Sequence, residues 1–130
     1  WIQLSPDAGT ADFNRLHSPV ELSAGSVALL DLHSVRVLSS AGLQTLAGAA
    51  SAGFVDGPAS VARFNGPLGL ARAPNGDLYI ADTENNAVRL LTASGQVRTV
   101  GRLTDRPSGI AVAPNGDVYV LVRHALLRGR

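Results

Sequence analysis

The sequence predicts an all-β protein built from repeated four-stranded antiparallel sheets. Residues 66–80 recur as residues 106–120, with prolines, glycines and β-forming residues at the same places. Both copies contain the hairpin turn Pro-Asn-Gly-Asp, at 74–77 and 114–117. Residues 78–81 are apolar on both faces of the predicted strand, so that strand must be covered from two sides. Repeated units that cannot bury both faces alone stack against their neighbours.

The clearest copy, residues 54–101, predicts four strands in succession. They are residues 68–73, 76–82, 87–92 and 96–100. Between the first two strands, we expect Asn75 and Gly76 to supply positive φ angles. Polar residues 83–86 and the Ala93-Ser94-Gly95 turn separate the others. The copy is therefore expected to be an antiparallel meander.

The rest of the chain fits the same template less closely. We expect one segment, 1–130. It begins with a single strand at 1–4, which corresponds to the fourth strand of a unit. A first unit at 11–48, a second at 54–101 and an incomplete third at 106–130 follow. In the third unit, Leu127-Arg128 aligns with Val88-Arg89 after a hairpin one residue shorter. The strands amount to about three units.

Three motifs in this chain resemble a known family. They are Phe54-Val55-Asp56-Gly57-Pro58, residues 62–70 and residues 77–89. Together they resemble the NHL-repeat β-propeller, which implies four-stranded blades in a ring of usually about six. The resemblance also implies that the loops after the second and fourth strands share one rim and that the first strands line the channel. The chain departs from the pattern because it lacks the Asn pair after Asp31 and has Val122 where the motif has Asp.

Three blades are too few to close such a ring. The chain is then half of a six-bladed propeller, and two explanations remain open. It is a fragment of a longer propeller, or it pairs with a second copy of itself and shares strand 1–4 between subunits, since an open sheet edge invites pairing.

Composition excludes several classes of partner. The net charge is +1 with 16% charged residues, which gives no reason to expect nucleic acid. No apolar run approaches the length of a transmembrane helix, so no membrane partner is expected. The absence of cysteine excludes disulfides and thiolate metal sites and leaves the compartment open.

Candidate ligand-binding residues fall in two places on the predicted rim. The set is Phe54, Asp56, Arg63, Asp82, Asn85 and Asn86. The last three belong to a turn, where such side chains either meet a ligand or bond local backbone N–H groups. The first three belong to the long connection 47–66, and long loops often carry function. Alternatively, Phe54 and Phe64 plug the junction between units while residues 59–64 make one helical turn.

A recurrent arginine in the third strand is expected to be structural. Arg36, Arg89 and Arg128 share this place in the alignment. Recurrence favours a repeated salt bridge or stacking contact, because a single active site rarely needs three copies.

No catalytic residues, cofactor or metal site are predicted. His17, His33 and His124 fall on the same rim, and the amidating-lyase branch of NHL-like propellers, which the chain resembles in fold, uses metal-bound histidine. None of the three has a partner at ligand spacing. The chain also lacks a phosphate-binding loop that precedes a helix and a nucleophile elbow.

These observations favour a non-catalytic binding or assembly module that recognises protein, peptide or glycan through its rim. The alternative is a metal-dependent lyase or hydrolase of the NHL-like type, which rests on the histidines and on analogy. RNA binding is a third hypothesis and needs an arginine-rich rim.

Overall fold

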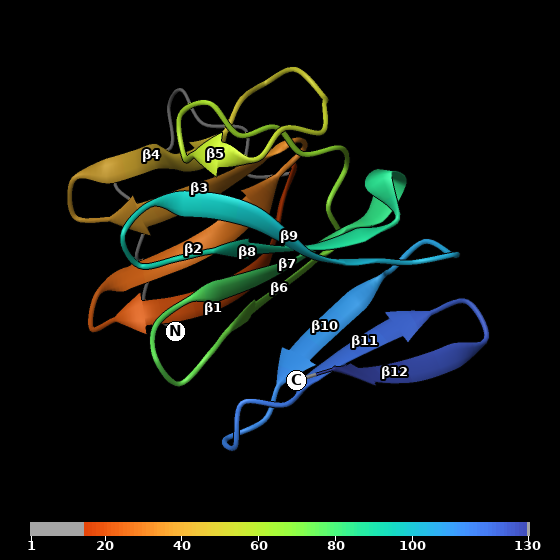
Figure 1. Ribbon diagram of the computed structural model, residues 1–130. Helices are drawn as coiled ribbons and strands as arrows, with labels where there is room; N and C mark the ends of the chain where they lie inside the picture. Colours follow the sequence, from red (N-terminus) through yellow and green to blue (C-terminus); the bar gives the residue numbers. More distant parts are fainter. Residues whose placement is uncertain (1–14, 130) are drawn as a thin grey trace.

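The computed structural model describes residues 15–129, which form three antiparallel sheets stacked side by side (Figure 1). Sheet one contains β1 (Leu16–Ser23), β2 (Ser26–Asp31), β3 (Ser34–Ser39) and β4 (Gly42–Gly48) in that order. Sheet two has the order β5 (Gly57–Pro58), β9 (Gln96–Arg102), β8 (Ala87–Leu91), β7 (Leu78–Asp82) and β6 (Gly69–Arg72). Sheet three contains β10 (Gly109–Val112), β11 (Val118–Val122) and β12 (Ala125–Gly129). The expected all-β fold with antiparallel sheets is confirmed.

Two local features differ from the sequence prediction. The short strand β5, which pairs with β9 at the edge of sheet two, was not foreseen. In the hairpin between β6 and β7, Gly76 has a φ of 94°, but Asn75 does not adopt a positive φ. Instead, the Asn75 side-chain oxygen accepts a hydrogen bond from the Asp77 N–H at 3.0 Å. The predicted strand at residues 1–4 lies outside the described residues.

The predicted alignment of the last strand is wrong by one residue. In sheet two, Arg89 lies opposite Ile80; the matching partner in sheet three, opposite Val120, is Leu127. Arg128 lies opposite Tyr119 instead. The reason is the turn: it spans residues 83–86 in sheet two but only 123–124 in sheet three, so the hairpin is shorter by two residues rather than one.

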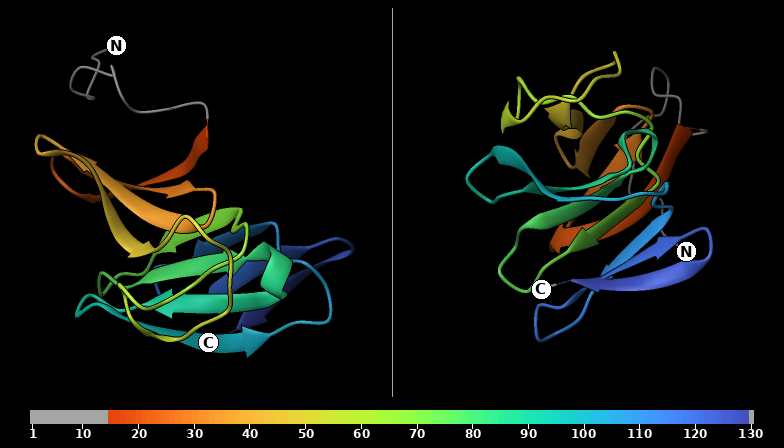
Figure 2. Two further views of the ribbon diagram at one scale, coloured as in Figure 1. Left: turned by 90° about the horizontal axis from the view of Figure 1, so that it is seen from above. Right: turned by 45° about the vertical axis from the view of Figure 1, so that its right-hand side comes forward.

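The sheets approach one another most closely at β1, β6 and β10, which are the first strands of the three repeated units along the chain. β1 contacts β6, and β6 contacts β10, although each belongs to a different sheet. Figure 2 shows the three sheets in chain order, each packed beside the next. The first strands therefore lie at the common inner side of the stack.

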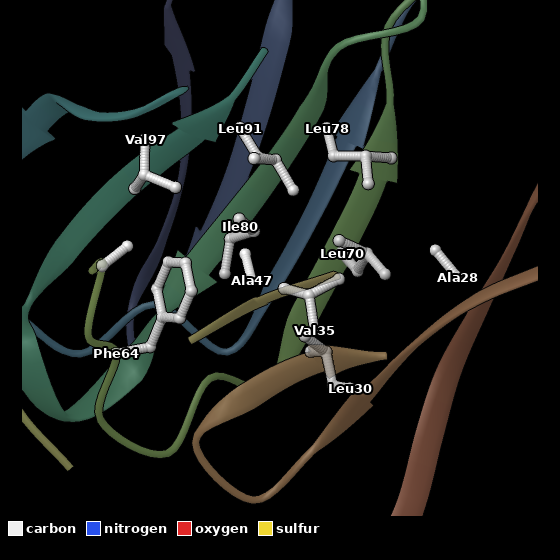
Figure 3. Close-up of a cluster of buried hydrophobic side chains, with 11 residues drawn as sticks. Ala28, Leu30, Val35, Ala47, Phe64, Leu70, Leu78, Ile80, Leu91 and Val97 are labelled. Atoms are coloured by element: carbon white, nitrogen blue, oxygen red, sulfur yellow. The ribbon is translucent and has the colours of Figure 1, made fainter. Parts of the chain in front are cut away.

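A hydrophobic core joins sheets one and two (Figure 3). Ala28, Leu30 and Val35 of sheet one face Ile80 and other residues of sheet two. The remaining members include Ala47, Ala62, Phe64, Leu70, Leu78, Leu91 and Val97. Phe64 comes from the connection between the sheets rather than from a strand, and it is fully buried.

A second core joins sheets two and three. Val88 packs with Val118, Val120 and Val122, and the half-buried Tyr79 lies against this group. Strand β7 thus sends Ile80 toward sheet one and Tyr79 toward sheet three, as its two apolar faces require. Within the described part of the chain, no helix is long and apolar enough to cross a membrane.

Gly48 provides a test of the junction between sheets one and two. Its φ is +86°, and a Cβ there would lie 2.8 Å from the His33 carbonyl oxygen and 2.9 Å from Phe64 Cδ2. We expect Gly48→Ala to lower the free energy of unfolding by about 3 kcal/mol, because it combines backbone strain with a steric clash. Urea unfolding measures the loss.

Gly25→Ala is the matched control. Gly25 has a similar φ of +83°, but nothing lies within 4 Å of the added Cβ. Only the backbone strain of about 1 kcal/mol is expected there. Equal losses for the two variants would contradict the packing described around Gly48.

Candidate functional site

The guanidinium of Arg89 is the centre of a buried polar cluster. Arg89 lies on β8 opposite Ile80, so its side chain faces sheet one, and it is fully buried. Its Nη1 donates to Asp82 Oδ2 at 2.7 Å and to the Arg63 carbonyl at 2.9 Å. Its Nη2 donates to the Val55 carbonyl at 2.8 Å and to Asp56 Oδ1 at 2.7 Å. A buried charge needs such partners, since it has lost its water.

Two aromatic rings complete the surroundings of Arg89. Its Cζ lies 4.7 Å from the centroid of the Phe54 ring and 5.0 Å from that of Phe64. The Cζ of Arg102 lies 4.6 Å from the Phe54 ring, which therefore has two guanidinium neighbours. Cation–π contacts of a desolvated arginine contribute up to about 2 kcal/mol. Phe54 and Phe64 thus fix the long connection over the strand that carries Arg89.

Asp82 ties the turn after β7 to the same connection. It is fully buried, and its Oδ1 accepts a hydrogen bond from the Asn65 N–H at 2.8 Å. Its Oδ2 also accepts from Asn85 Nδ2 at 2.8 Å. The same Asn85 nitrogen donates to the Gly53 carbonyl at 2.8 Å. We call Arg89, Asp82, Asp56, Asn85, Phe54 and Phe64 the Arg89 cluster.

Asp56 closes the cluster on its solvent side. The side chain is 48% exposed, and it accepts hydrogen bonds from the Thr99 hydroxyl at 3.0 Å and the Thr99 N–H at 3.2 Å. Burial alone would raise the pKa of Asp56, but hydrogen bonds from Arg89 and Thr99 and the positive charge of Arg89 hold it below its usual value. Asp56 is therefore a carboxylate at neutral pH that joins the connection to β9.

The structure brings together candidates that the sequence placed in two separate groups. Phe54, Asp56, Asp82 and Asn85 all contact Arg89 or its partners. The guanidinium of Arg63 instead donates to the carbonyls of its own turn, and only its backbone oxygen reaches Arg89.

Asn86 has a structural place at the end of the same turn. It follows the 3-10 helix η2 (Thr83–Asn85) in the left-handed conformation, with a φ of 49°. Its N–H donates to the Thr83 carbonyl at 3.2 Å, and its own carbonyl accepts from the Leu103 N–H at 2.7 Å. The turn is thereby joined to the connection that leads to sheet three.

Sequence reasoning missed that Arg89 organises these residues. The signal was present, because an Asp at the end of the second strand recurs with an Arg on the third strand: Asp31 with Arg36 and Asp82 with Arg89. Arg36 Nη1 lies 3.0 Å from Asp31 Oδ2, and Arg15 Nη2 lies 3.2 Å from Asp31 Oδ1. Strand alternation places this pair on the face of sheet one turned away from sheet two.

Sheet three replaces both members of the pair with apolar residues. Val122 stands at the position of Asp82, and Leu127 stands at that of Arg89. The connection to sheet three is also short, residues 103–108, and brings no counterpart of Phe54 or Asp56. Sheet three therefore lacks both the buried ion pair and the long segment that covers this pair in sheet two.

The three histidines are not brought together in one group. His17 Nδ1 lies 3.0 Å from the Ser18 hydroxyl, whereas His33 Nδ1 accepts a hydrogen bond from the Gly66 N–H at 2.9 Å. Among residues 15–129, no three His, Cys, Asp or Glu side chains form a group that could hold a metal ion. His124 lies in the short turn between β11 and β12.

The turns and connections meet on one rim of the stack. Arg106 forms an ion pair with Glu84, which links the connection before sheet three to the η2 turn. A cavity of about 200 Å³ opens beside this pair and is lined by Leu68, Thr83, Asp105, Arg106, Ser108 and Arg123. This mixed-charge hollow could take a small polar group of a ligand, and the residues chosen from the sequence do not line it.

The apolar pair of sheet three suggests a double-mutant cycle in sheet two. We expect Arg89→Leu to cost about 4 kcal/mol, because it leaves the buried Asp82 carboxylate without a cation. Asp82→Val should cost about 3 kcal/mol, because the buried Arg89 then keeps only the half-exposed Asp56 as a charged partner. The double variant, which reproduces the pair in sheet three, should cost ~2 kcal/mol less than the sum. Urea unfolding of the four proteins measures the coupling, and strictly additive losses would contradict the pairing.

The lowered pKa of Asp56 predicts that the stability of the fold depends on pH. Because its pKa is lowered in the folded protein, its charge stabilises the fold above its ordinary pKa of about 4, and this contribution is lost as the pH falls through the folded value. We expect Asp56→Asn to lower the free energy of unfolding by about 1 kcal/mol at about pH 6, since a half-exposed pair is screened by solvent. The difference should shrink toward about pH 3. If the difference in unfolding free energy between the two proteins stays constant over this pH range, the lowered pKa of Asp56 is contradicted.

Comparison with known proteins matches part of the chain to a sequence family. Residues 64–89 match the model of the NHL repeat. A segment of 47 residues is 47% identical to the protein SUPPRESSOR OF QUENCHING 1, chloroplastic, of Arabidopsis thaliana. This match covers 36% of the chain but only 4% of that protein.

Solved structures match most of the chain. An auxiliary nutrient binding protein from Bacteroides thetaiotaomicron matches 81% of it with a TM-score of 0.66 and 19% identity. The virginiamycin B lyase of Staphylococcus aureus matches 88% with a TM-score of 0.65 and 12% identity. The chain spans 34% and 41% of these two structures, so they show its fold and not its activity. The protein is an all-β chain with a propeller-type fold, and its residues 64–89 match the NHL repeat.

Proposed function

We propose that this chain is a non-catalytic binding and assembly module of a β-propeller. Its sheets act as blades that are completed by further blades, supplied by a second copy or by the remainder of a longer propeller. Its rim recognises protein, peptide or glycan. The observation that carries the proposal is the contrast between the middle sheet and sheet three.

Within residues 15–129, the middle sheet is covered on both faces, and sheet three is not. All five residues of β8 are buried, whereas all five of the corresponding strand β12 are exposed. Sheet three exposes Leu121 and Leu126, which are 50% and 64% accessible. Apolar surface of this kind favours contact with a further sheet.

The polar residues of the middle sheet support a structural role. Arg89, Asp82 and Asn85 use their side chains to hold the connection between sheets. They are therefore engaged within the fold and are poorly placed for proton transfer to a substrate. The hollow beside Arg106 and Arg123 offers both charge and hydrogen-bond donors at the rim, which suits recognition of a polar ligand.

Mass and stability in solution test the assembly role. We expect light scattering to show twice the chain mass, or an aggregating monomer if the remaining blades belong to the same longer chain. For a self-completing ring, the melting temperature should rise with protein concentration. A monodisperse monomer with a concentration-independent melting temperature and no binding of a hydrophobic dye would contradict the proposal. Turnover that depends on an added metal ion would contradict its non-catalytic part.

A further inference from the structure

A hollow at the rim between sheets two and three is lined by side chains of both charges. It is the cavity of about 200 Å³ described above, and we call it the rim hollow. Its lining residues come from four segments: the approach to β6, the turn after β7, the connection 103–108 and the turn between β11 and β12. The rim hollow therefore belongs to the junction between two described sheets.

The link beside the rim hollow differs from the link at the junction between sheets one and two. There, His33 Nδ1 accepts a hydrogen bond from the Gly66 N–H at 2.9 Å, so the turn after β2 contacts the backbone of the next connection. Between sheets two and three, the side chains of Glu84 and Arg106 join the corresponding turn and connection. A pair of long side chains spans a wider gap than a contact to the backbone, and the rim hollow lies beside this pair.

The rim hollow offers one carboxylate and one guanidinium that the fold does not pair. Asp105 Oδ1 accepts a hydrogen bond from the Arg106 N–H at 2.7 Å, which holds the carboxylate in its turn. Its other oxygen, Oδ2, accepts no hydrogen bond from residues 15–129. Arg123 is exposed and forms no ion pair with another described residue. Since Glu84 already compensates Arg106, the charges left for a ligand are those of Asp105 and Arg123.

The size and the uncharged groups of the rim hollow suit a small polar molecule. Its volume of about 200 Å³ lies below the roughly 300–1,000 Å³ of pockets for drug-sized ligands. At about 30 Å³ for each water-sized group, it holds about seven such groups, which is the size of a small α-amino acid. The Ser108 hydroxyl makes only a long hydrogen bond of 3.4 Å to the Leu121 carbonyl, so it is able to turn toward a ligand. Leu68, which is 46% exposed, supplies an apolar wall.

We propose that the rim hollow binds a free α-amino acid as its zwitterion. The α-carboxylate pairs with the Arg123 guanidinium, and the α-ammonium group pairs with the Asp105 carboxylate. The side chain of a small amino acid contacts Leu68 and the Ser108 hydroxyl. Because each charge of the ligand meets an opposite charge of the protein, neither partner keeps an uncompensated charge. This proposal rests on the rim recognition given above and deepens it, since it names the chemical class of one ligand.

Three matched small molecules test the proposal at neutral pH. They are L-serine, N-acetyl-L-serine, which has no ammonium group, and L-serinamide, which has no carboxylate. Titration of backbone amide shifts in ¹⁵N NMR spectra gives both the affinity and the site. We expect serine to bind with a dissociation constant of about 1 mM and each blocked compound to bind at least about tenfold more weakly. The shifts should concentrate at Thr83, Asp105, Arg106, Ser108 and Arg123.

Two variants separate the roles of the two charged side chains. In Asp105→Asn, the preference for serine over N-acetylserine should disappear, while the Asn oxygen still accepts the hydrogen bond from the Arg106 N–H and keeps the turn. In Arg123→Gln, the preference for serine over serinamide should disappear. Arg72→Gln makes the same change at an exposed arginine on β6, outside the rim hollow, and should leave all three affinities unchanged.

Several results would overturn the proposal. Equal affinities for the three compounds, or no amide shifts with serine at about ten times the expected dissociation constant, would remove the zwitterion. Amide shifts away from the rim hollow would remove the site. Tighter binding of N-acetylserine than of serine would assign the hollow to the carboxyl end of a peptide, which contradicts the amino acid but leaves rim recognition of peptides intact. None of these readouts depends on the oligomeric mass, so the assembly role and the amino-acid site can fail separately.

Discussion

The fully buried charge of Arg89 constrains the whole middle of this molecule. A guanidinium without water must find acceptors, and here it finds two carboxylates, two backbone carbonyls and two aromatic rings. Five of these six partners belong to the connection between sheets one and two, and the sixth, Asp82, ends β7. The connection is therefore held against sheet two, and Phe64 is inserted into the core that joins the sheets. Stacking of the sheets and placement of the long loop follow from one interaction.

Sheets two and three show that this interaction and its covering segment occur together. Sheet two has Asp82 and Arg89 and the long connection that covers them. Sheet three follows a short connection, residues 103–108, and has Val122 and Leu127 at the same positions. Replacing both members of a buried ion pair by apolar residues avoids the cost of leaving one charge alone. Leu127 of this apolar pair lines an open groove between sheets two and three.

Much of the fold could be predicted from the sequence because its signals are local. The Pro-Asn-Gly-Asp turns mark the hairpins, and the apolar residues on both faces of 78–81 require a sheet on either side. The alignment of Leu127 failed because Leu126 and Leu127 are adjacent and both apolar, so alternation alone does not decide which of them faces sheet two, and matching Arg128 to Arg89 by residue type gave the wrong choice. The Arg89 cluster could not be assembled in advance, since Asp56 and Arg89 are distant in sequence and meet only after the connection folds back. The recurrent Asp and Arg indicated a salt bridge but not the loop that it holds.

Native-state hydrogen exchange tests the central role of Arg89 most directly. The amides of Gly53, Arg63 and Asn65 donate hydrogen bonds within or next to the cluster, although none belongs to a named strand. If Arg89 holds the connection as described, these amides should exchange with the same opening free energy as those of β7 and β8, in one cooperative unit. Exchange of these three amides at the rate of an ordinary surface loop, while β7 and β8 remain protected, would contradict the account.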